Sequence, residues 1–326
     1  MKLTVASSPH IRGNFRTNRI MLDVVIALLP ALAVGVWRLG VRALIVTLIS
    51  VVTAVAAEGL YSEVVRKKKI AGGAGNVAKN TIADGSAVVT GLLLAMTLPA
   101  SVPYWQVVVG CVFAIIMVKA LCGGLGQNIF NPALAGRALM MLIYPVGVIS
   151  YHAVSVDGAS GATPMHQMAM SSVPGESLLD MFLGNCSGSI GETCSLALLL
   201  GGAYLIWRRV ISIRIPAAYL GTVAVLSLFF CKAGAPFTWM LYSLLGGGVM
   251  LGAIFMATDY ATSPATALGQ IIYGIGCGVL TVIFRNFGLY PEGVTYAILL
   301  MNAFVWIIDR YTAPRRFGVV KGGAAK

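Results

Sequence analysis

Ten apolar runs, each close to the length needed to cross a lipid bilayer, set the tightest limit on what this chain can fold into. A transmembrane helix needs about 20 mostly apolar residues, because in hydrocarbon every backbone N–H and C=O must find its partner within the segment. The runs cover roughly 20–37, 43–62, 85–99, 104–121, 134–150, 193–207, 215–231, 238–257, 266–284 and 293–308. Hydrophobic residues make up 58% of the chain and charged residues only 10%, which excludes a soluble enzyme. We therefore predict an all-α polytopic membrane protein with about ten transmembrane helices.

The basic residues are unevenly divided between the two sides that these spans define. An even number of spans places both termini on one side, and that side then holds nineteen of the 23 Lys and Arg residues. The other side keeps only Arg38, Arg42, Lys232 and Arg285. Because cytoplasmic loops carry the excess of Lys and Arg, we predict that both termini are cytoplasmic. The net charge of +12 then reflects the membrane topology of the chain, and it does not indicate nucleic-acid binding.

The longest loop, residues 151–192, has the opposite charge character. It contains Asp157, Glu176, Asp180 and Glu192 and no Lys or Arg. The same distribution rule therefore predicts that this loop is extracytoplasmic.

The two halves of the sequence resemble each other weakly. Residues 91–97 align with 252–258, and residues 131–141 align with 290–300, at offsets close to half the chain. Five spans in each half would give two repeats of inverted topology, with interrupted helices near the bilayer midplane. The chain then divides into a first five-helix repeat at 1–150, the loop at 151–192, a second five-helix repeat at 193–310 and a basic cytoplasmic tail at 311–326.

Motifs of soluble enzymes and of metal sites are missing from the sequence. The glycine-rich runs match neither a dinucleotide fingerprint nor a phosphate-binding loop, and no Cys-x-x-Cys pair occurs among the six cysteines. We therefore predict no metal site. Cys186 and Cys194 share the outer loop, and the sequence leaves a disulfide between them open.

Three carboxylates lie within or beside the apolar runs. Asp23 and Glu58 belong to the first and second spans, and Asp259 lies at the interruption before the ninth. Ionisable groups in a membrane are costly and are candidates for function. Each of the three could bind a cation or relay protons, and each could instead cap a helix or pair with an arginine. They are the candidate ion path, for either Na⁺ or H⁺.

The most informative stretch of the outer loop is Ser155-Val-Asp-Gly-Ala-Ser-Gly-Ala-Thr-Pro-Met165. Small residues precede Thr163, and Pro164 biases Thr163 towards an extended conformation. Local physics alone predicts an accessible hydroxyl in a tight turn.

This stretch resembles the flavinylation motif of the RnfD/NqrB family, the membrane subunits of Rnf and sodium-pumping NADH:quinone oxidoreductase complexes. In that family the Thr that closes a Ser-Gly-Ala-Thr run carries FMN through a phosphoester bond. The resemblance implies covalent FMN at Thr163, with Ser160, Gly161 and Ala162 completing the run and Asp157 at its start. Residues 7–10, 127–133 and 258–264 match the family as well.

The resemblance implies a fold similar to that of urea transporters, with two inverted five-helix repeats, in a bacterial or archaeal cell membrane. It favours the RnfD branch, because only about 20 residues precede the first span. It also implies a subunit that is inactive alone, contributes no catalytic residue and relays electrons between ferredoxin and NAD while Na⁺ or H⁺ is moved. The implied partners are the A, B, C, E and G subunits.

Two further expectations follow from the resemblance. The helices leave room for a second, non-covalent flavin such as riboflavin, whose residues the spacing does not identify. The alternatives are an NqrB-like subunit of a quinone reductase and a stand-alone solute channel or transporter on the same scaffold. The Thr163 motif disfavours the channel, because a permease does not need a flavinylation motif.

Overall fold

The described residues of this computed structural model are 17–71, 84–151, 163–288 and 293–314. Their regular structure is entirely helical, and they contain no strand. The helices are α1 (Thr17–Leu39), α2 (Val41–Ala71), α3 (Ser86–Met96), α4 (Tyr104–Val112), the π-helix η2 (Phe113–Ala120), α5 (Pro132–Ile143), α6 (Pro145–Ile149), α7 (Pro164–Ala169), α8 (Leu178–Leu183), α9 (Ser195–Trp207), α10 (Arg214–Phe229), α11 (Pro236–Leu245), α12 (Val249–Leu251), the π-helix η3 (Gly252–Met256), α13 (Ala267–Phe287) and α14 (Val294–Thr312).

Several of these helices are long and apolar enough to cross a membrane. They are α1, α2 over Val41–Val64, α13 and α14, and α11 with α12 and η3 is a fifth candidate that bends by 61°. Other apolar helices have 10–17 residues, which is short for a span. The all-helical membrane fold is confirmed at this level.

Three predicted spans differ from the helices that form. The predicted span 238–257 breaks because Gly247 and Gly248 adopt positive φ angles of 66° and 68°, which end α11 and redirect the chain into α12. The predicted span 134–150 stops at Ile143, since Pro145 follows Tyr144 and starts α6. The predicted span 85–99 is only the 11-residue α3.

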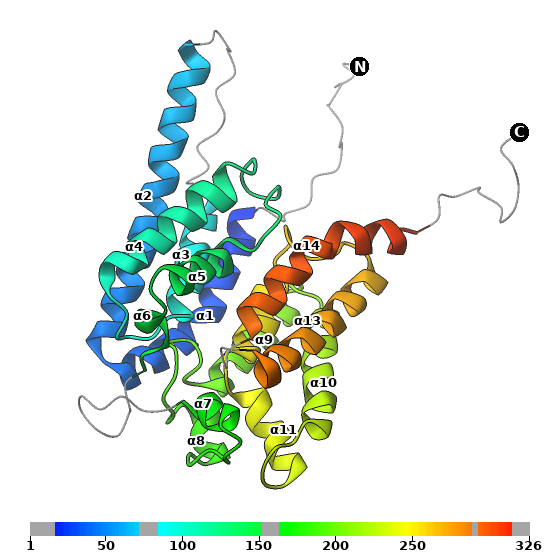
Figure 1. The fold of residues 1–326 in the computed structure, drawn as a ribbon. Coiled ribbons are helices and arrows are strands. Elements are labelled where there is room, and N and C mark those ends of the chain that lie inside the picture. The colour runs from blue at the N-terminus through cyan, green and yellow to red at the C-terminus, as the bar shows by residue number, and fades with distance from the viewer. Residues whose placement is uncertain (1–16, 72–83, 152–162, 289–292, 315–326) are drawn as a thin grey trace, which may run out of the picture.

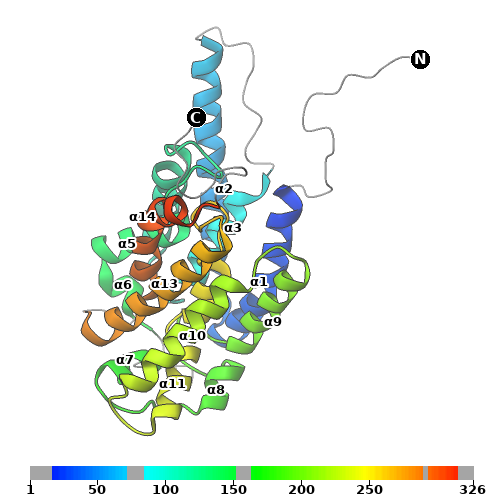
Figure 2. The same cartoon turned by 90° about the vertical axis from the view of Figure 1, so that its right-hand side faces the viewer.

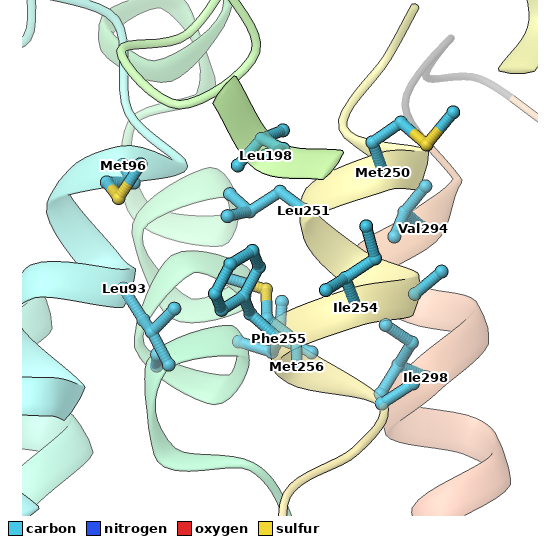
Figure 3. Packing of buried hydrophobic residues seen from close by; sticks show 14 of the residues in the cluster. Leu93, Met96, Leu198, Met250, Leu251, Ile254, Phe255, Met256, Val294 and Ile298 are labelled. Atoms are coloured by element: carbon cyan, nitrogen blue, oxygen red, sulfur yellow. The ribbon is translucent and has the colours of Figure 1, made fainter. Parts of the chain in front are cut away.

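The helices pack in two groups that meet along α1, α5, α9 and α14. In the first group α2 packs on α3, α4 and η2, and in the second α10 packs on α11 and α13 (Figures 1 and 2). Between the groups α1 contacts α9, and α5 contacts α14. Figure 3 shows the core at this junction, where Leu93 and Met96 of α3 face Leu251 and Phe255, with Ile298 of α14 beyond them.

The segment before α9 is buried rather than part of an exposed outer loop. Ser189, Ile190 and Thr193 have no exposed surface. The Ile190 N–H donates to the Leu98 carbonyl (3.0 Å), and the Gly191 N–H donates to the Met96 carbonyl (2.7 Å). The segment therefore supplies backbone donors to the carbonyls at the end of α3, which an apolar core could not satisfy.

Charged side chains in this region correct the interpretation of the sequence. Glu192 belongs to the buried segment, and a Cβ on Gly248 would lie 2.6 Å from Glu192 Oε1. Arg137 on α5, expected at the cytoplasmic surface, is also buried and lines the same small cavity as Glu192. Lys119, expected beside it, is buried too. All three charged side chains are thus buried within the protein rather than exposed at its surface.

The four basic residues expected on the outer side gather at one end of the bundle. Arg38 donates to Asn185 after α8 (3.1 Å), and Arg42 donates to the Ser101 carbonyl (3.0 Å). Lys232 and Arg285 line a groove beside α7. The end that carries α7 and α8, at the bottom of Figure 1, is thus the end that these residues share.

Close contact between α1 and α9 generates the first prediction. A Cβ on Gly201 of α9 would lie 2.2 Å from the Ala27 carbonyl oxygen of α1. Gly201→Ala should therefore push the helices apart and lower the free energy of unfolding by about 1–3 kcal/mol. Detergent-induced unfolding followed by circular dichroism measures this.

Gly221→Ala on α10 is the matched control, because a Cβ there has nothing within 4 Å. It should be neutral or stabilise by up to about 1 kcal/mol, since alanine is the better helix former. Equal losses from both substitutions would show that the α1–α9 contact is not as close as described.

Candidate functional site

Thr163 is the N-cap of the short helix α7. Its backbone is extended (φ −63°, ψ 155°), as Pro164 predicts, and its Oγ1 accepts a hydrogen bond from the His166 N–H at 3.2 Å. The sequence predicted an accessible turn, whereas the side chain is only 6% exposed and begins a helix. Within the described residues Oγ1 accepts this bond and donates none.

Apolar and polar contacts fix α7 against the second group of helices. Met165 and Met168 pack in a cluster with Met181, Trp239 and Tyr242, which come from α8 and α11. The cluster is separate from the main core, and it holds the residues that follow Thr163 against α11.

A second set of contacts ties the segment after α7 to the same place. Gln167 Oε1 accepts from the Gly175 N–H at 2.8 Å, and the Tyr242 hydroxyl donates to the Glu176 carbonyl at 2.8 Å. Thr163 is therefore anchored at a defined position on the bundle.

Two cations lie beside α7, although its own loop has no basic residue. Lys232 and Arg285 line a groove together with Met165 and Met168. The Arg285 guanidinium donates to the carbonyls of Ser243 (2.6 Å), Gly246 (2.8 Å) and Gly247 (3.1 Å), where α11 breaks. The C-terminal end of a helix attracts positive charge, so the break holds Arg285 in place. The sequence did not connect either cation with Thr163, because they follow it by about 70 and 120 residues.

The other residues of the predicted motif, Asp157, Ser160, Gly161 and Ala162, lie outside the described residues.

Asp23 is paired at the end of the bundle opposite α7. The carboxylate accepts from the Tyr204 hydroxyl (2.9 Å) and from Arg208 (3.3 Å), both on or beside α9. This is the arginine pairing that the sequence left open.

Glu58 belongs to a buried polar network that the sequence did not predict. Lys119 Nζ lies 2.8 Å from Glu58 Oε1 and donates to Ser86 Oγ at 2.6 Å, and Ser86 Oγ donates to Asp84. Lys119 and Glu58 stand 61 positions apart. No periodicity within one span could have paired them.

Asp259 lies in the turn after η3, where its carboxylate accepts from the Thr262 hydroxyl at 3.2 Å. Asp259 and Lys119 both line a cavity between the two groups of helices, together with Asn128, Asn131 and Phe255. The structure thus brings Asp259 and Lys119, the partner of Glu58, to one cavity, whereas Glu58, Asp23 and Thr163 do not line it.

The described part of the chain contains no cluster of three or more His, Cys, Asp or Glu side chains that could hold a metal ion. All six cysteines are free thiols. Cys186 Sγ donates to the Thr193 carbonyl and Cys194 Sγ donates to the Phe182 carbonyl, so each thiol has its own partner.

Comparison with known proteins gives concordant matches over nearly the whole chain. Residues 4–318 match the model of the NQR2, RnfD, RnfE family. The chain is 46% identical to the D subunit of the Na⁺-translocating ferredoxin:NAD⁺ oxidoreductase complex of Acetobacterium woodii, over 98% of this chain and 97% of that protein. It is 42% identical to the D subunit of the proton-translocating ferredoxin:NAD⁺ oxidoreductase complex of Clostridium ljungdahlii, over 97% and 96%. It is 36% identical to the D subunit of the ion-translocating oxidoreductase complex of Citrobacter koseri, over 98% and 99%.

The buried ion pair yields a stability prediction. Lys119→Met should lower the free energy of unfolding by about 3–5 kcal/mol, because it leaves the Glu58 carboxylate buried without its cation. The double variant Glu58→Gln/Lys119→Met should regain most of that loss, since no lone charge remains. Chemical unfolding of the purified chain measures both.

Arg310→Met is the control, since the Arg310 side chain is exposed at the end of α14. It should cost about 1 kcal/mol or less. A Lys119→Met variant as stable as this control would mean that Lys119 and Glu58 do not form a buried pair.

The thiols yield a prediction on pH. Burial, with a smaller effect of the Glu192 charge, raises the pKa of Cys186 to about 12, so its thiol stays protonated near neutral pH. Alkylation requires the thiolate, and we expect Cys186 in the folded protein to react far more slowly at pH 8 than the exposed Cys122. Mass spectrometry after timed alkylation measures this. Failure of Cys186 and Cys194 to react after denaturation without reductant would instead indicate a disulfide.

Proposed function

Because the chain belongs to the NQR2, RnfD, RnfE family, we propose that it is the D-type membrane subunit of an Rnf complex, the ion-translocating ferredoxin:NAD⁺ oxidoreductase. The observation that carries this is the match along almost the entire length of subunits with that name. Its partners are the other subunits of the complex, A, B, C, E and G. It is active as part of that assembly, and the coupled ion is Na⁺ or H⁺.

Within this role Thr163 carries covalent FMN through a phosphoester bond. The geometry fits such a bond, because Thr163 Oγ1 donates no hydrogen bond within the described residues and its hydrogen is free to be replaced. The ester oxygen keeps a lone pair for the His166 N–H, so the N-cap of α7 survives the modification. When bound, FMN supplies electron transfer, while the protein supplies position and electrostatics.

The residues around Thr163 fix and neutralise the group that it carries. The apolar cluster around Met165 and Trp239 holds α7 in place, and so does the hydrogen bond from the Tyr242 hydroxyl to the Glu176 carbonyl. The covalent link to FMN therefore starts from a fixed position on the protein. Lys232 and Arg285 supply positive charge beside α7, and they offset the acidic residues of the loop. Positive charge nearby favours a phosphate and a negatively charged reduced flavin.

The chain crosses the membrane ten times in two inverted five-helix repeats, with both termini cytoplasmic and the α7 end extracytoplasmic. Equivalent packing in the two halves supports this: α2 packs on α3 as α10 packs on η3, α2 packs on α4 as α10 packs on α13, and α4 with η2 packs on α5 as α13 packs on α14. The contacts α1–α9 and α5–α14 join equivalent helices across the pseudo-two-fold axis. The grouping of Arg38, Arg42, Lys232 and Arg285 at the α7 end supports the orientation.

Asp23, Glu58 and Asp259 remain the candidate ion path of this subunit. Asp259 lines a cavity at the junction of the repeats together with Lys119, the partner of Glu58, which favours these two carboxylates over Asp23. A second, non-covalent flavin such as riboflavin also remains part of this proposal.

The tether can be tested on a denaturing gel viewed under ultraviolet light. The wild-type chain, made in a host with the flavin-transferring enzyme, should give a fluorescent band at 34.2 kDa. Thr163→Asn should abolish the band completely, because asparagine keeps the N-cap acceptor but has no hydroxyl to esterify.

Ser177→Asn is the matched control, since Ser177 caps α8 in the same way by accepting from the Asp180 N–H. It should leave the fluorescence unchanged. A band that survives in Thr163→Asn would refute the assignment of Thr163, and a wild-type chain without fluorescence in that host would refute covalent flavin altogether.

A further inference from the structure

A charged cavity of about 450 Å³ lies at the end of the bundle opposite α7, between the first turns of α1 and the end of α9. Its lining includes Arg19 and Asp23 from α1, Trp207 from α9, Arg208 and Arg209 from the following turn, and Tyr260. We call this the arginine pocket. None of its lining residues belongs to the groove beside α7, and it adjoins the cavity that Asp259 and Lys119 share, because Ile20, Val210 and Tyr260 line both.

The arginine pocket has a surplus of positive charge. Asp23 is its only acidic residue, and that carboxylate is already bound by Arg208 and the Tyr204 hydroxyl. Arg19 and Arg209 have no ion pair or side-chain hydrogen bond to the described part of the chain. Two guanidinium groups are therefore available to an anion that enters the pocket.

The backbone of Arg209 gives an independent indication that its side chain is used. Arg209 adopts φ +55°, and it closes α9 with the Arg209 N–H on the Ile206 carbonyl and the Val210 N–H on the Leu205 carbonyl. This is the helix-ending motif in which glycine is strongly favoured, because a Cβ strains the left-handed conformation. An arginine in this strained conformation points to a role for the guanidinium.

An apolar surface continues from the pocket along the same two helices. On α1, Leu22 and Ile26 are exposed and share a helical face with Arg19 and Asp23. On α9, Leu200 and Trp207 are exposed two turns apart, and Trp207 is 79% exposed. Tryptophan at the end of an apolar helix face is typical of the boundary between lipid chains and headgroups.

We propose that the arginine pocket binds the phosphate headgroup of an anionic phospholipid, whose acyl chains lie on the exposed face of α1 and α9. A phosphate diester meets the charge of Arg19 and Arg209, and the adjoining apolar face distinguishes a lipid from free phosphate. The site goes beyond the redox role and does not depend on the flavin. With the orientation proposed above, the lipid belongs to the cytoplasmic leaflet, where anionic lipids attract basic clusters.

The test uses the full chain in neutral detergent with brominated phospholipids, which quench nearby tryptophan fluorescence. The signal of Trp207 is the difference between the parent chain and Trp207→Phe. We expect brominated phosphatidylglycerol to quench Trp207 at a several-fold lower mole fraction than brominated phosphatidylcholine. Inorganic phosphate at millimolar concentration should not relieve that quenching.

Arg19→Gln and Arg209→Gly should each weaken the preference for phosphatidylglycerol by about fivefold, the contribution of one arginine near a lipid surface. Arg209→Gly should also keep or raise the melting temperature, because glycine relieves the strain at φ +55°. Arg310→Gln is the control, since Arg310 is exposed at the end of α14 and outside the pocket. It should leave the preference intact.

Three results would overturn the proposal. Equal quenching by the two lipids would show that the pocket does not select an anionic lipid. Displacement by inorganic phosphate alone would identify a free-anion site. A loss in Arg310→Gln as large as in Arg209→Gly would show only general attraction to negative surfaces.

Discussion

Helices that break inside an apolar bundle leave backbone carbonyls that neither water nor lipid can satisfy, and the centre of this structure is organised around that constraint. α3 ends at Met96 and η3 ends at Met256 in the middle of the core. The carbonyls of Met96 and Leu98 accept from the buried segment before α9, and the Met256 carbonyl accepts from Asn131 Nδ2 at 3.1 Å.

The same solution is used in both halves. The Thr97 hydroxyl donates to the Leu94 carbonyl, and the Thr258 hydroxyl donates to the Ile254 carbonyl. At each break a threonine hydroxyl thus donates to a carbonyl of the last turn of its own helix. Further carbonyls at the break accept from a segment elsewhere in the chain. The junction of the two groups of helices, and the cavity that Asp259 and Lys119 share, follow from these breaks.

Electrostatics divides the molecule into two ends with different tasks. At the α7 end the break after α11 holds Arg285 through three carbonyls and places positive charge beside an otherwise acidic loop. At the opposite end Arg208 neutralises Asp23. The other two arginines of that pocket, Arg19 and Arg209, are available to an anion from outside the chain. The buried pair of Lys119 and Glu58 carries no net charge.

Local sequence signals predicted much of this architecture, but they did not predict contacts between residues that are distant in the sequence. The apolar runs predicted α1, α2, α13 and α14, and Pro164 predicted the extended backbone at Thr163. The sequence did not predict that Glu192 is buried, because its loop carries the charge pattern of an exposed segment. It also did not predict that Lys119 is buried and paired with Glu58, since a count of charges by loops ignores pairing across helices.

The sequence by itself determined the class of protein, its membrane setting and the motif that ends at Thr163, because these depend on composition and on neighbouring residues. Only the tertiary structure decided which charges are paired, where α11 breaks, and that Thr163 caps a helix beside Lys232 and Arg285. The physical reason is that a buried charge or an open carbonyl must find its partner in space, and in this chain those partners lie tens to more than a hundred residues away.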